Sequence, residues 1–553
     1  MSRYSKLLKS RDKWKEKAAR RAAENRYLRS ELTRVKRERD KFKDEGKEAQ
    51  KRRSEDKDDE ETMPAISSKE DFVFIALQLF CMARIGFRAV SRVLGVLRRH
   101  LGLAKAPCPQ TVINWVERLS IARMQSRCLP IPAASPGAPP CRGLIWILDM
   151  TITLGGLKIL CVLGIEADYY AGRTKGEDKA PSLGDVRCLG VSVAASWNGE
   201  EIAQFLLKVI DGAGRPVAFL KDGGTDLAKA VKILGEQGHA ASSIDDVSHV
   251  VANPLKNYYG SHPLFQTFIS ACGQVSRKFK LSILACLAPP KVSTKSRFMN
   301  LHRLVVWADR LLKHSPAGRA AKGSLLEKLR GSLDRIPQCK SFIGGFLRDA
   351  VPLLECRKIL KIKGLSEESA GQCRSLLESL PPYSPVRLGF LEWLESQLQI
   401  ARELELAETG LPASSDSIES LFGVAKTLGA GEVKNAHRIA ARLPILCGEV
   451  TREDARRVLK ASVAQQKELM KGFPSLVAQR RQILSRPGHL EDLASSSIPR
   501  RFELIAGVQN CSKNSEFNRM SMPYANDSDP VIRGSDKTLS SSDGCVPCFA
   551  AAG

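Results

Sequence analysis

The sequence predicts a mixed α/β protein that is divided into several structural units. Three observations support this fold class. The chain has 553 residues, more than a single hydrophobic core usually serves. Between residues 143 and 253, apolar runs typical of strands alternate with helical patterns. From 254 to 411 the pattern is helical throughout, with many Leu and Lys residues.

The charge balance indicates a polyanionic partner. The chain carries 86 Lys and Arg residues against 60 Asp and Glu residues, a formal net charge of +26. Such an excess most often serves nucleic-acid binding, and we expect DNA as the partner. A generally basic protein, such as a ribosome-associated one, is the alternative.

No membrane segment is expected. The longest apolar stretch, residues 144–165, contains Asp149 and Lys158 and has Gly155 and Gly156 at its centre. Two buried strands joined by a turn fit this stretch better than a membrane span. The N-terminus has no apolar signal-peptide core, and most of the 15 cysteines lie in apolar runs. We therefore expect a cytoplasmic, nucleoid-associated protein without a membrane partner.

Residues 1–62 are almost entirely charged or small, and we expect a basic coiled-coil helix there. An Asn at a buried heptad position favours a dimer, so a homodimer or higher oligomer is expected. The alternative is a solvated basic helix that lies on DNA. One seven-residue grid, interrupted at Arg21, holds Leu7, Trp14, Leu28, Val35 and Phe42. The second grid position, interrupted at Arg11 and Arg39, holds Tyr4, Ala18, Asn25 and Leu32.

Residues 65–126 contain three helical patterns, over 72–83, 87–101 and 111–124. Three short helices with tight turns suit a helix-turn-helix DNA-binding module. An ordinary small helical bundle is the alternative. A Pro-, Ala- and Gly-rich linker is expected over 127–142. The candidate DNA-contacting residues, on a polar face of the third helix, are Thr111, Asn114 and Arg118.

The part that follows has the element order of a ribonuclease-H-like fold, namely three strands, helix, strand, helix and strand. We expect this catalytic domain over 143–253 and 412–475, with a helical insertion at 254–411. The tail 485–553 is polar, Ser-rich and aperiodic, and we expect it to be disordered. The expected strands are 144–149, 158–167, 188–197, 216–222 and a short one around Val247, and the expected helices are 200–210 and 226–237.

Two acids follow apolar runs in this domain. Asp149 comes after five apolar residues, and Asp222 follows Val217–Lys221 and precedes two glycines that permit a tight turn. An acid in such a place is costly in a core unless it is paired or binds a metal. A solvent-facing acid at a strand end is the alternative for Asp149. Asp226 competes with Asp222, but it is better explained as an acid in the first turn of a helix.

The third candidate acid is Glu419, one turn inside a helix that opens at Ser415 or Asp416. The alternative is a capping box, in which Glu419 serves only the helix end. A second polar set, Asp246, His249, Asn253 and Lys256, has the spacing of one helix face. For His249 and Lys256 we weigh an auxiliary role near DNA against a purely structural one, and Pro254 interrupts the pattern between them.

This combination resembles bacterial insertion-sequence transposases of the Asp–Asp–Glu, retroviral-integrase-like superfamily. The resemblance covers roughly residues 1–475, and its most specific parts are Asp149, the turn Lys221–Gly224 and the block Asp416–Gly423. The separation of Asp222 and Glu419 is long for the simplest members and is similar to members with a helical insertion. The tail after 485 has no counterpart.

The resemblance implies a DNA transposase that hydrolyses a phosphodiester at transposon ends and joins the freed 3′-OH to target DNA. Asp149, Asp222 and Glu419 are then both catalytic residues and metal ligands, holding two Mg²⁺ (or Mn²⁺) ions per active site, which in such enzymes lie about 4 Å apart. Two alternatives remain open. One is a ribonuclease-H-fold nuclease that does not transpose, and the other is a non-catalytic, transposase-derived DNA-binding regulator.

Overall fold

The computed structural model describes residues 68–102, 105–125, 143–152, 156–171, 179–291, 297–316, 318–428, 435–471, 473, 476–485 and 501–507, with single positions between Lys15 and Asp40. The predicted linker 127–142, most of the predicted coiled coil and most of the tail lie outside these residues. The chain forms two compact units. The helical unit comprises Met1–Trp115, Leu428–Ala430 and Val450–Leu459, and the sheet unit comprises Val116–Thr427, Gly431–Glu449 and Lys460–Gly553.

A six-stranded mixed sheet organises the sheet unit. Its strand order is β5-β4-β1-β2-β3-β6, in which β1 pairs in parallel with β4, and β4 with β5. The pairs β1–β2, β2–β3 and β3–β6 are antiparallel. Along the chain the first elements come in the predicted order. They are β1 (Leu144–Ile152), β2 (Lys158–Glu166), η1 (Leu183–Asp185), β3 (Arg187–Ala194), α5 (Gly199–Ala213), β4 (Ala218–Lys221), α6 (Thr225–Glu236) and β5 (Ser242–Asp245).

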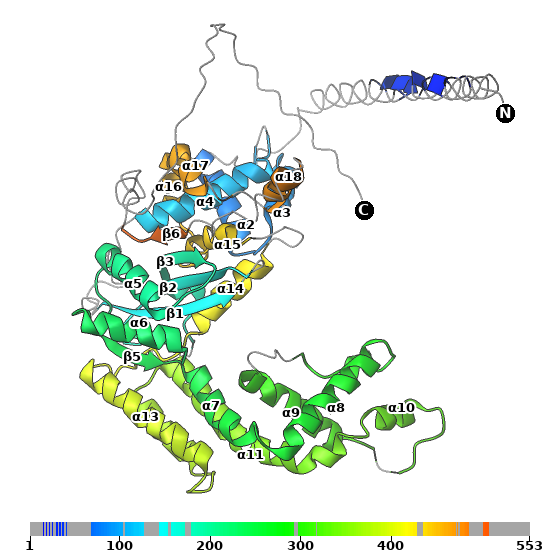
Figure 1. Cartoon of the computed structure of the whole chain (residues 1–553), viewed down its shortest axis with the longest axis vertical. Helices are drawn as coiled ribbons and strands as arrows, with labels where there is room; N and C mark the ends of the chain where they lie inside the picture. The colour runs from blue at the N-terminus through cyan, green and yellow to red at the C-terminus, as the bar shows by residue number, and fades with distance from the viewer. Residues whose placement is uncertain are drawn as a thin grey trace, which may run out of the picture. The chain divides into compact units, whose positions relative to one another are not determined.

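Different helices pack against the two faces of the sheet. Trp146 and Leu148 of β1 belong to a core cluster with apolar residues of α5 and α6, which lie together on one side of the strands (Figure 1). Side chains alternate along a strand, so Asp149 and Thr151 belong to the other face. There Lys426 of α14 (Asp416–Thr427) donates a hydrogen bond to the Thr151 hydroxyl, and α14 packs on β1. The short α15 (Ala436–Ala440) packs on β2 and β3.

Three details differ from the sequence prediction. β1 continues beyond Asp149 to Ile152, because Met150, Thr151 and Ile152 still pair with β2. The fifth strand is Ser242–Asp245, and Val247, which was expected in a strand, is the first residue of α7. Asp246 caps that helix by accepting a hydrogen bond from the His249 amide, which ends the strand earlier than predicted.

A strand also occurs inside the predicted tail. β6 (Phe502–Ile505) pairs with β3, so the prediction of disorder over 485–553 is wrong for these residues. Phe502 and Leu504 are buried, and Lys208 of α5 forms a 2.9 Å ion pair with Glu503 between them. Burial of these two side chains stabilises a strand that a polar, Ser-rich surrounding sequence does not suggest.

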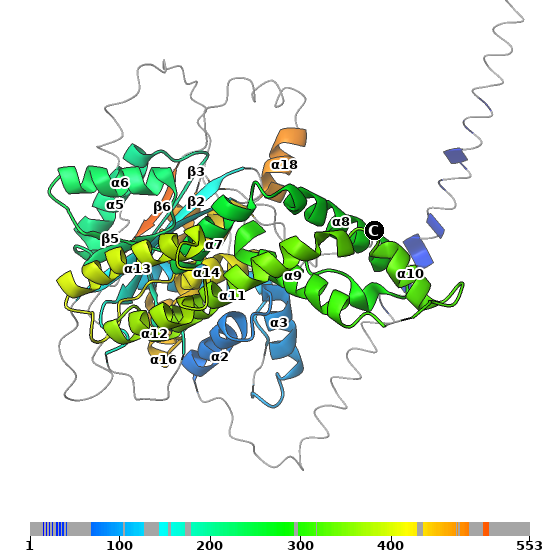
Figure 2. The ribbon, with the colours of Figure 1, turned by 90° about the horizontal axis from the view of Figure 1, so that it is seen from below.

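A helical segment lies between β5 and α14 in the chain. Helices α7, α9 and α11 pack against one another (Figures 1 and 2), and α13 contacts both α7 and β5. The end of this segment lies beside its beginning, because the Val247 amide donates a hydrogen bond to the Ala413 carbonyl at 3.0 Å. The elements are α7 (Val247–Tyr259), α8 (Pro263–Lys280), η2 (Ala285–Leu287), α9 (Arg297–Lys313), α10 (Leu325–Ser332), η3 (Pro337–Cys339), α11 (Lys340–Lys363), α12 (Glu367–Leu377) and α13 (Pro385–Glu403).

The helical unit contains α2 (Lys69–Cys81), α3 (Phe87–Val96) and the start of α4 (Pro109–Gln125), which agree with the three helical patterns of the sequence. Phe72 meets Trp115 edge-on at 5.8 Å, and Phe80 stacks on Phe87 at 4.7 Å. These ring contacts form an apolar core between the helices.

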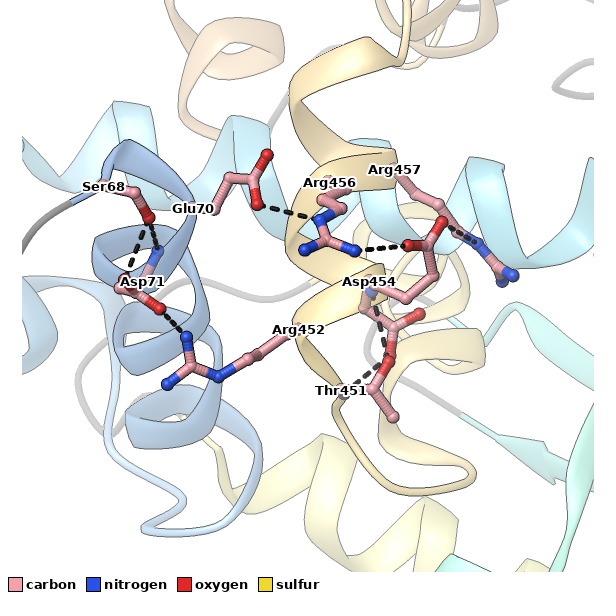
Figure 3. Close-up of polar contacts among 9 residues, drawn as sticks. Ser68, Glu70, Asp71, Thr451, Arg452, Asp454, Arg456 and Arg457 are labelled. Atoms are coloured by element: carbon pink, nitrogen blue, oxygen red, sulfur yellow. Dashed lines mark hydrogen bonds and ion pairs between the residues drawn. The ribbon is translucent and has the colours of Figure 1, made fainter.

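Helix α16 (Arg452–Lys460), far along the chain, completes this unit. Arg452 forms an ion pair with Asp71, and Arg456 pairs with Glu70 at 2.9 Å (Figure 3). Both acids lie in the first turn of α2. The sequence grouped 412–475 with the catalytic domain, whereas residues 450–459 belong to the helical unit.

The remaining short elements are η4 (Pro444–Leu446), α17 (Val463–Met470) and α18 (Leu476–Leu484). Over the ranges that the structure describes, every helix is too short or too polar to span a membrane.

Candidate active site

The strand register brings two of the predicted acids together. Leu148 of β1 lies opposite Lys221, the last residue of β4. Asp149 is the next residue of β1, and Asp222 is the first residue after β4. Lys221 in turn lies opposite Asp245 of β5, which places Asp246 next in line. Asp222 and Asp246 thus follow the carboxyl ends of β4 and β5, the edge of a sheet where ligands commonly bind. Asp149 lies beside Asp222, three residues before the end of β1.

Asp222 is held by the turn that follows it. Its Oδ1 atom accepts a hydrogen bond from the Gly224 amide at 3.0 Å. A Cβ atom at Gly224 would lie 2.8 Å from that same oxygen, closer than such contacts allow, whereas a Cβ at Gly223 would meet open space. Gly224 is therefore required for the position of the Asp222 carboxylate, and Gly223 is not.

Asp246 connects the sheet edge to α14. Its buried carboxylate accepts hydrogen bonds from the Ser415 amide at 2.8 Å and from the His249 amide and ring Nδ1 at 3.0 Å each. These bonds lower the pKa of Asp246 although burial opposes them. Ser415 directly precedes α14, so Asp246 fixes the start of the helix that carries Glu419.

Asp149 is the most perturbed acid of the group. Burial raises the pKa of its carboxyl to about 7, and the charges of Asp222 and Glu419 add to the rise. The backbone amide of Met150, 2.6 Å from Asp149 Oδ1, and the charge of His249 act in the opposite direction. Asp149 thus lies in the electrostatic field of both other candidate acids.

Glu419 is exposed, yet its surroundings still raise the pKa of its carboxyl, through burial of part of the group and the charges of Asp246 and Asp416. Within the described part of the chain, no hydrogen bond joins this carboxylate to the start of α14. The capping-box interpretation of Glu419 therefore has no contact to support it.

His249 provides a positive charge at this edge. The hydrogen bond that its ring Nδ1 donates to Asp246 raises the pKa of its imidazole to about 9, and the charges of Asp222 and Glu419 contribute. The ring is therefore protonated at neutral pH. Lys256, the other proposed auxiliary residue, lies further along α7 and is exposed. Helix α7 continues through Pro254, contrary to the expected interruption.

The structure brings Asp149, Asp222, Glu419 and His249 into one electrostatic group, but it does not assemble a finished metal site. Among the described residues, no three His, Cys, Asp or Glu side chains are close enough to hold a metal ion. The donors are nevertheless of the right kind, since carboxylate oxygens are the ligands that Mg²⁺ and Mn²⁺ prefer. Burial is the main cause of the raised pKa of Asp149, and the smaller contribution, repulsion by Asp222 and Glu419, is one that a bound cation relieves.

A polar cavity of about 450 Å³ adjoins Glu419. Asp416, at one side, accepts from Lys361 of α11 and, at 3.4 Å, from the Ser248 hydroxyl of α7. The lining residues are Ser248, Asn300, Arg303, Arg357, Lys361, Asp416, Glu419 and Ser420. Sequence analysis did not predict the arginines of this cavity, because α9 and α11 carry many other Lys and Arg residues that mark no single position.

The candidate DNA-contacting residues lie on α4. Thr111, Asn114 and Arg118 are half-buried, and Asn114 Oδ1 accepts a hydrogen bond from Gln110 Nε2 at 2.9 Å. Burial lowers the pKa of Arg118. A helix-turn-helix function for these helices and the roles of the three residues stay predictions.

No protein-family model matches the chain, and no curated protein sequence matches it. Among solved structures, the chain is similar to the Drosophila P element transposase strand transfer complex, at 12% identity, over 71% of this chain and 93% of that chain. The TM-score is 0.38, a likeness that decides neither fold nor function.

Proposed function

We propose that the chain is a DNA transposase of the Asp–Asp–Glu type, built on a ribonuclease-H-like sheet. The observation that carries the proposal is the strand register. It sets Asp149, inside β1, beside Asp222, which directly follows β4, while the Ser415–Asp246 hydrogen bond ties the start of α14, the helix of Glu419, to the end of β5. The order of strands and helices, with a helical segment before α14, fits the same fold.

Asp149, Asp222 and Glu419 are the residues that would hold two Mg²⁺ or Mn²⁺ ions. Bound there, the ions would supply charge for the attacking and leaving oxygens of a phosphodiester. The chain's own contributions are positional. Gly224 orients Asp222, Asp246 fixes the start of α14, and protonated His249 offsets part of the negative charge.

The proposed reaction has two steps. Water attacks the phosphodiester at a transposon end and a 3′-OH is released. That 3′-oxygen then attacks a phosphodiester of the target DNA, forms a new bond to phosphorus and displaces the target's own 3′-oxygen. Neither step requires a covalent bond between protein and DNA.

The helical unit and the basic N-terminal residues are the proposed sites of DNA binding and self-association. A net charge of +26 supports binding that weakens steeply with salt, because each phosphate contact releases counterions. Terminal and target DNA are the proposed partners, with a dimer or higher oligomer as the active assembly.

A non-catalytic DNA-binding regulator is the second candidate. One observation favours it. Among the described residues, no three His, Cys, Asp or Glu side chains lie close enough together to hold a metal ion. A regulator of this kind would bind DNA normally and cleave none.

The two candidates are separated by a cleavage assay on duplexes that carry the DNA flanking the gene. We expect Asp149→Asn, Asp222→Asn and Glu419→Gln each to lower Mg²⁺-dependent cleavage at least about 10³-fold, as loss of a metal ligand does. Asp226→Asn is the matched control, because Asp226 lies in the first turn of α6, only four positions from Asp222. Metal-independent DNA binding should survive in all four. Cleavage by Glu419→Gln at the wild-type rate would reject Glu419 as the third acid, and binding without cleavage by the wild type would favour the regulator.

A further inference from the structure

Two helices of the helical segment, α9 and α11, contribute cationic side chains to the cavity beside Glu419. Arg303 comes from α9, and Arg357 and Lys361 come from α11. Lys361 is already paired with Asp416. Within the described ranges, by contrast, no hydrogen bond or ion pair engages the guanidinium of Arg303 or of Arg357. The cavity therefore holds two guanidinium groups without a hydrogen-bond partner in the described part of the chain, next to a candidate catalytic acid.

Arg357 is the more informative of the two. Its side chain is half-buried, and burial lowers the pKa of its guanidinium. The positive charge of Arg303 acts the same way, while Asp416 and other carboxylates oppose it. Half-burying the Arg357 guanidinium beside the charge of the exposed Arg303, with no hydrogen-bond partner among the described residues, costs free energy. Such an arrangement is stabilised by an anion, and the planar donors of arginine match phosphate oxygens.

We propose that this cavity binds a phosphate group of the nucleic-acid strand, adjacent to the phosphate that faces the candidate carboxylates. Arg303 and Arg357 are its charged donors, and Asn300 offers a neutral one. The inference rests on the proposed function for the identity of the strand. It adds that the helical segment is part of the substrate site, where it positions the strand relative to Glu419.

The neighbouring acids favour a strand over a free anion. Glu419 and Asp416 line the same cavity and offset much of the attraction that its three cationic groups exert on a small anion that diffuses in alone. A DNA strand that is anchored elsewhere on a protein of net charge +26 brings its phosphate to the cavity as part of a larger contact. The cavity, at about 450 Å³, is also larger than an isolated phosphate group requires.

The test measures binding of a fluorescent single-stranded oligonucleotide to the full chain without divalent metal, across a salt series. Arg303→Gln and Arg357→Gln are compared with Arg310→Gln and Lys358→Gln. The controls remove the same charge from exposed positions of the same two helices that do not line the cavity. Arg357→Lys keeps the charge and loses the paired donors, and thermal unfolding of every variant checks that it folds.

We expect each cavity arginine variant to weaken binding roughly tenfold and to reduce the salt slope by about 0.7, the value for one phosphate of a single strand. The two control variants should change binding less than about twofold. Arg357→Lys should fall between wild type and Arg357→Gln. Equal effects of cavity and control variants would overturn the proposal, because net charge alone would then explain them.

A second arm adds inorganic pyrophosphate at constant ionic strength and follows thermal unfolding. Stabilisation that is lost in Arg357→Gln, with oligonucleotide binding unchanged, would overturn the strand assignment in favour of a free phosphate compound. The test is independent of cleavage. If the wild type binds the oligonucleotide through both arginines and cleaves nothing, the proposed function fails and the phosphate subsite stands.

Discussion

Charged side chains are arranged in opposite ways in the two units. At the edge of the sheet, burial raises the pKa of Asp149 to about 7, and the like charges of Asp222 and Glu419 add to the rise. In the helical unit, Glu70 and Asp71 are each matched by an arginine of α16 (Figure 3). The first arrangement opposes folding in the absence of a ligand, whereas the second joins two distant parts of the chain.

This difference separates a candidate site from a structural contact. Exposed ion pairs contribute little free energy, so their presence tells how the chain is assembled. A buried carboxylate near other acids is costly, so an acid with such a raised pKa is a candidate for a binding role. The neighbouring bonds of Asp246 show that this protein can pair a buried acid fully, which makes the crowding of Asp149 more informative.

Outside the three candidate acids, the largest expected effect concerns the turn after β4. Gly224→Ala places a Cβ 2.8 Å from Asp222 Oδ1 and should displace that carboxylate. We expect DNA cleavage to fall by about 10²-fold, as a misplacement near 1 Å does. Gly223→Ala is the matched control, because the space around it is open. Equal activity of the two variants would show that the position of Asp222 is unimportant.

A smaller effect is expected in the pH dependence of stability. The pKa of Asp149 in the folded protein, about 7, is above its ordinary value of 3.8, so the folded state holds an extra proton between these values. Its stability therefore declines as pH rises from 3.8 to about 7. Asp149→Asn should remove that decline and raise the free energy of unfolding above pH 7 by roughly 1–3 kcal/mol.

Denaturant unfolding at pH 4.0 and pH 8.0 measures this effect in the wild type and in Asp149→Asn, both without divalent metal. The variant's advantage should be present at pH 8.0 and absent at pH 4.0. An equal difference at both values would mean that the substitution acts through packing and not through the carboxylate charge.

The smallest effect is expected in the helical unit. Arg452→Ala and Arg456→Ala each remove one ion pair with α2, and each should lower the melting temperature only slightly. Thermal unfolding at low and at high salt checks this, since screening should reduce the difference. A large fall in melting temperature that persists in high salt would mean that these pairs are not the weak contacts that the comparison assumes.

The sequence was most informative where an acidic residue ends a recognisable apolar run. Asp149 and Asp222 stand at the ends of apolar runs, and such runs are visible in one dimension. The order of strands and helices through β5 was predictable for the same reason. The extension of β1 to Ile152 was not, because it depends on the pairing partner supplied by β2.

Contacts between distant segments could not be predicted from local sequence patterns. The partners Arg452 and Asp71 are separated by most of the chain, and β6 is recognisable as a strand only beside β3. Asp246 appeared in the sequence as one member of a polar helix face. Its hydrogen bond with the Ser415 amide, which fixes the start of α14, could not be predicted from the sequence. It joins residues on either side of the helical segment and depends on the three-dimensional fold.

The central claim is that Asp149, Asp222 and Glu419 act together on divalent metal. It is tested most directly by the melting temperature at pH 8.0, with and without Mg²⁺, in the wild type and in Asp149→Asn, Asp222→Asn, Glu419→Gln and Asp226→Asn. We expect Mg²⁺ to raise the melting temperature of the wild type and of Asp226→Asn by roughly 2–6 °C. The three site variants should show little or no rise. The same rise in all five proteins, or none in the wild type, would contradict the account.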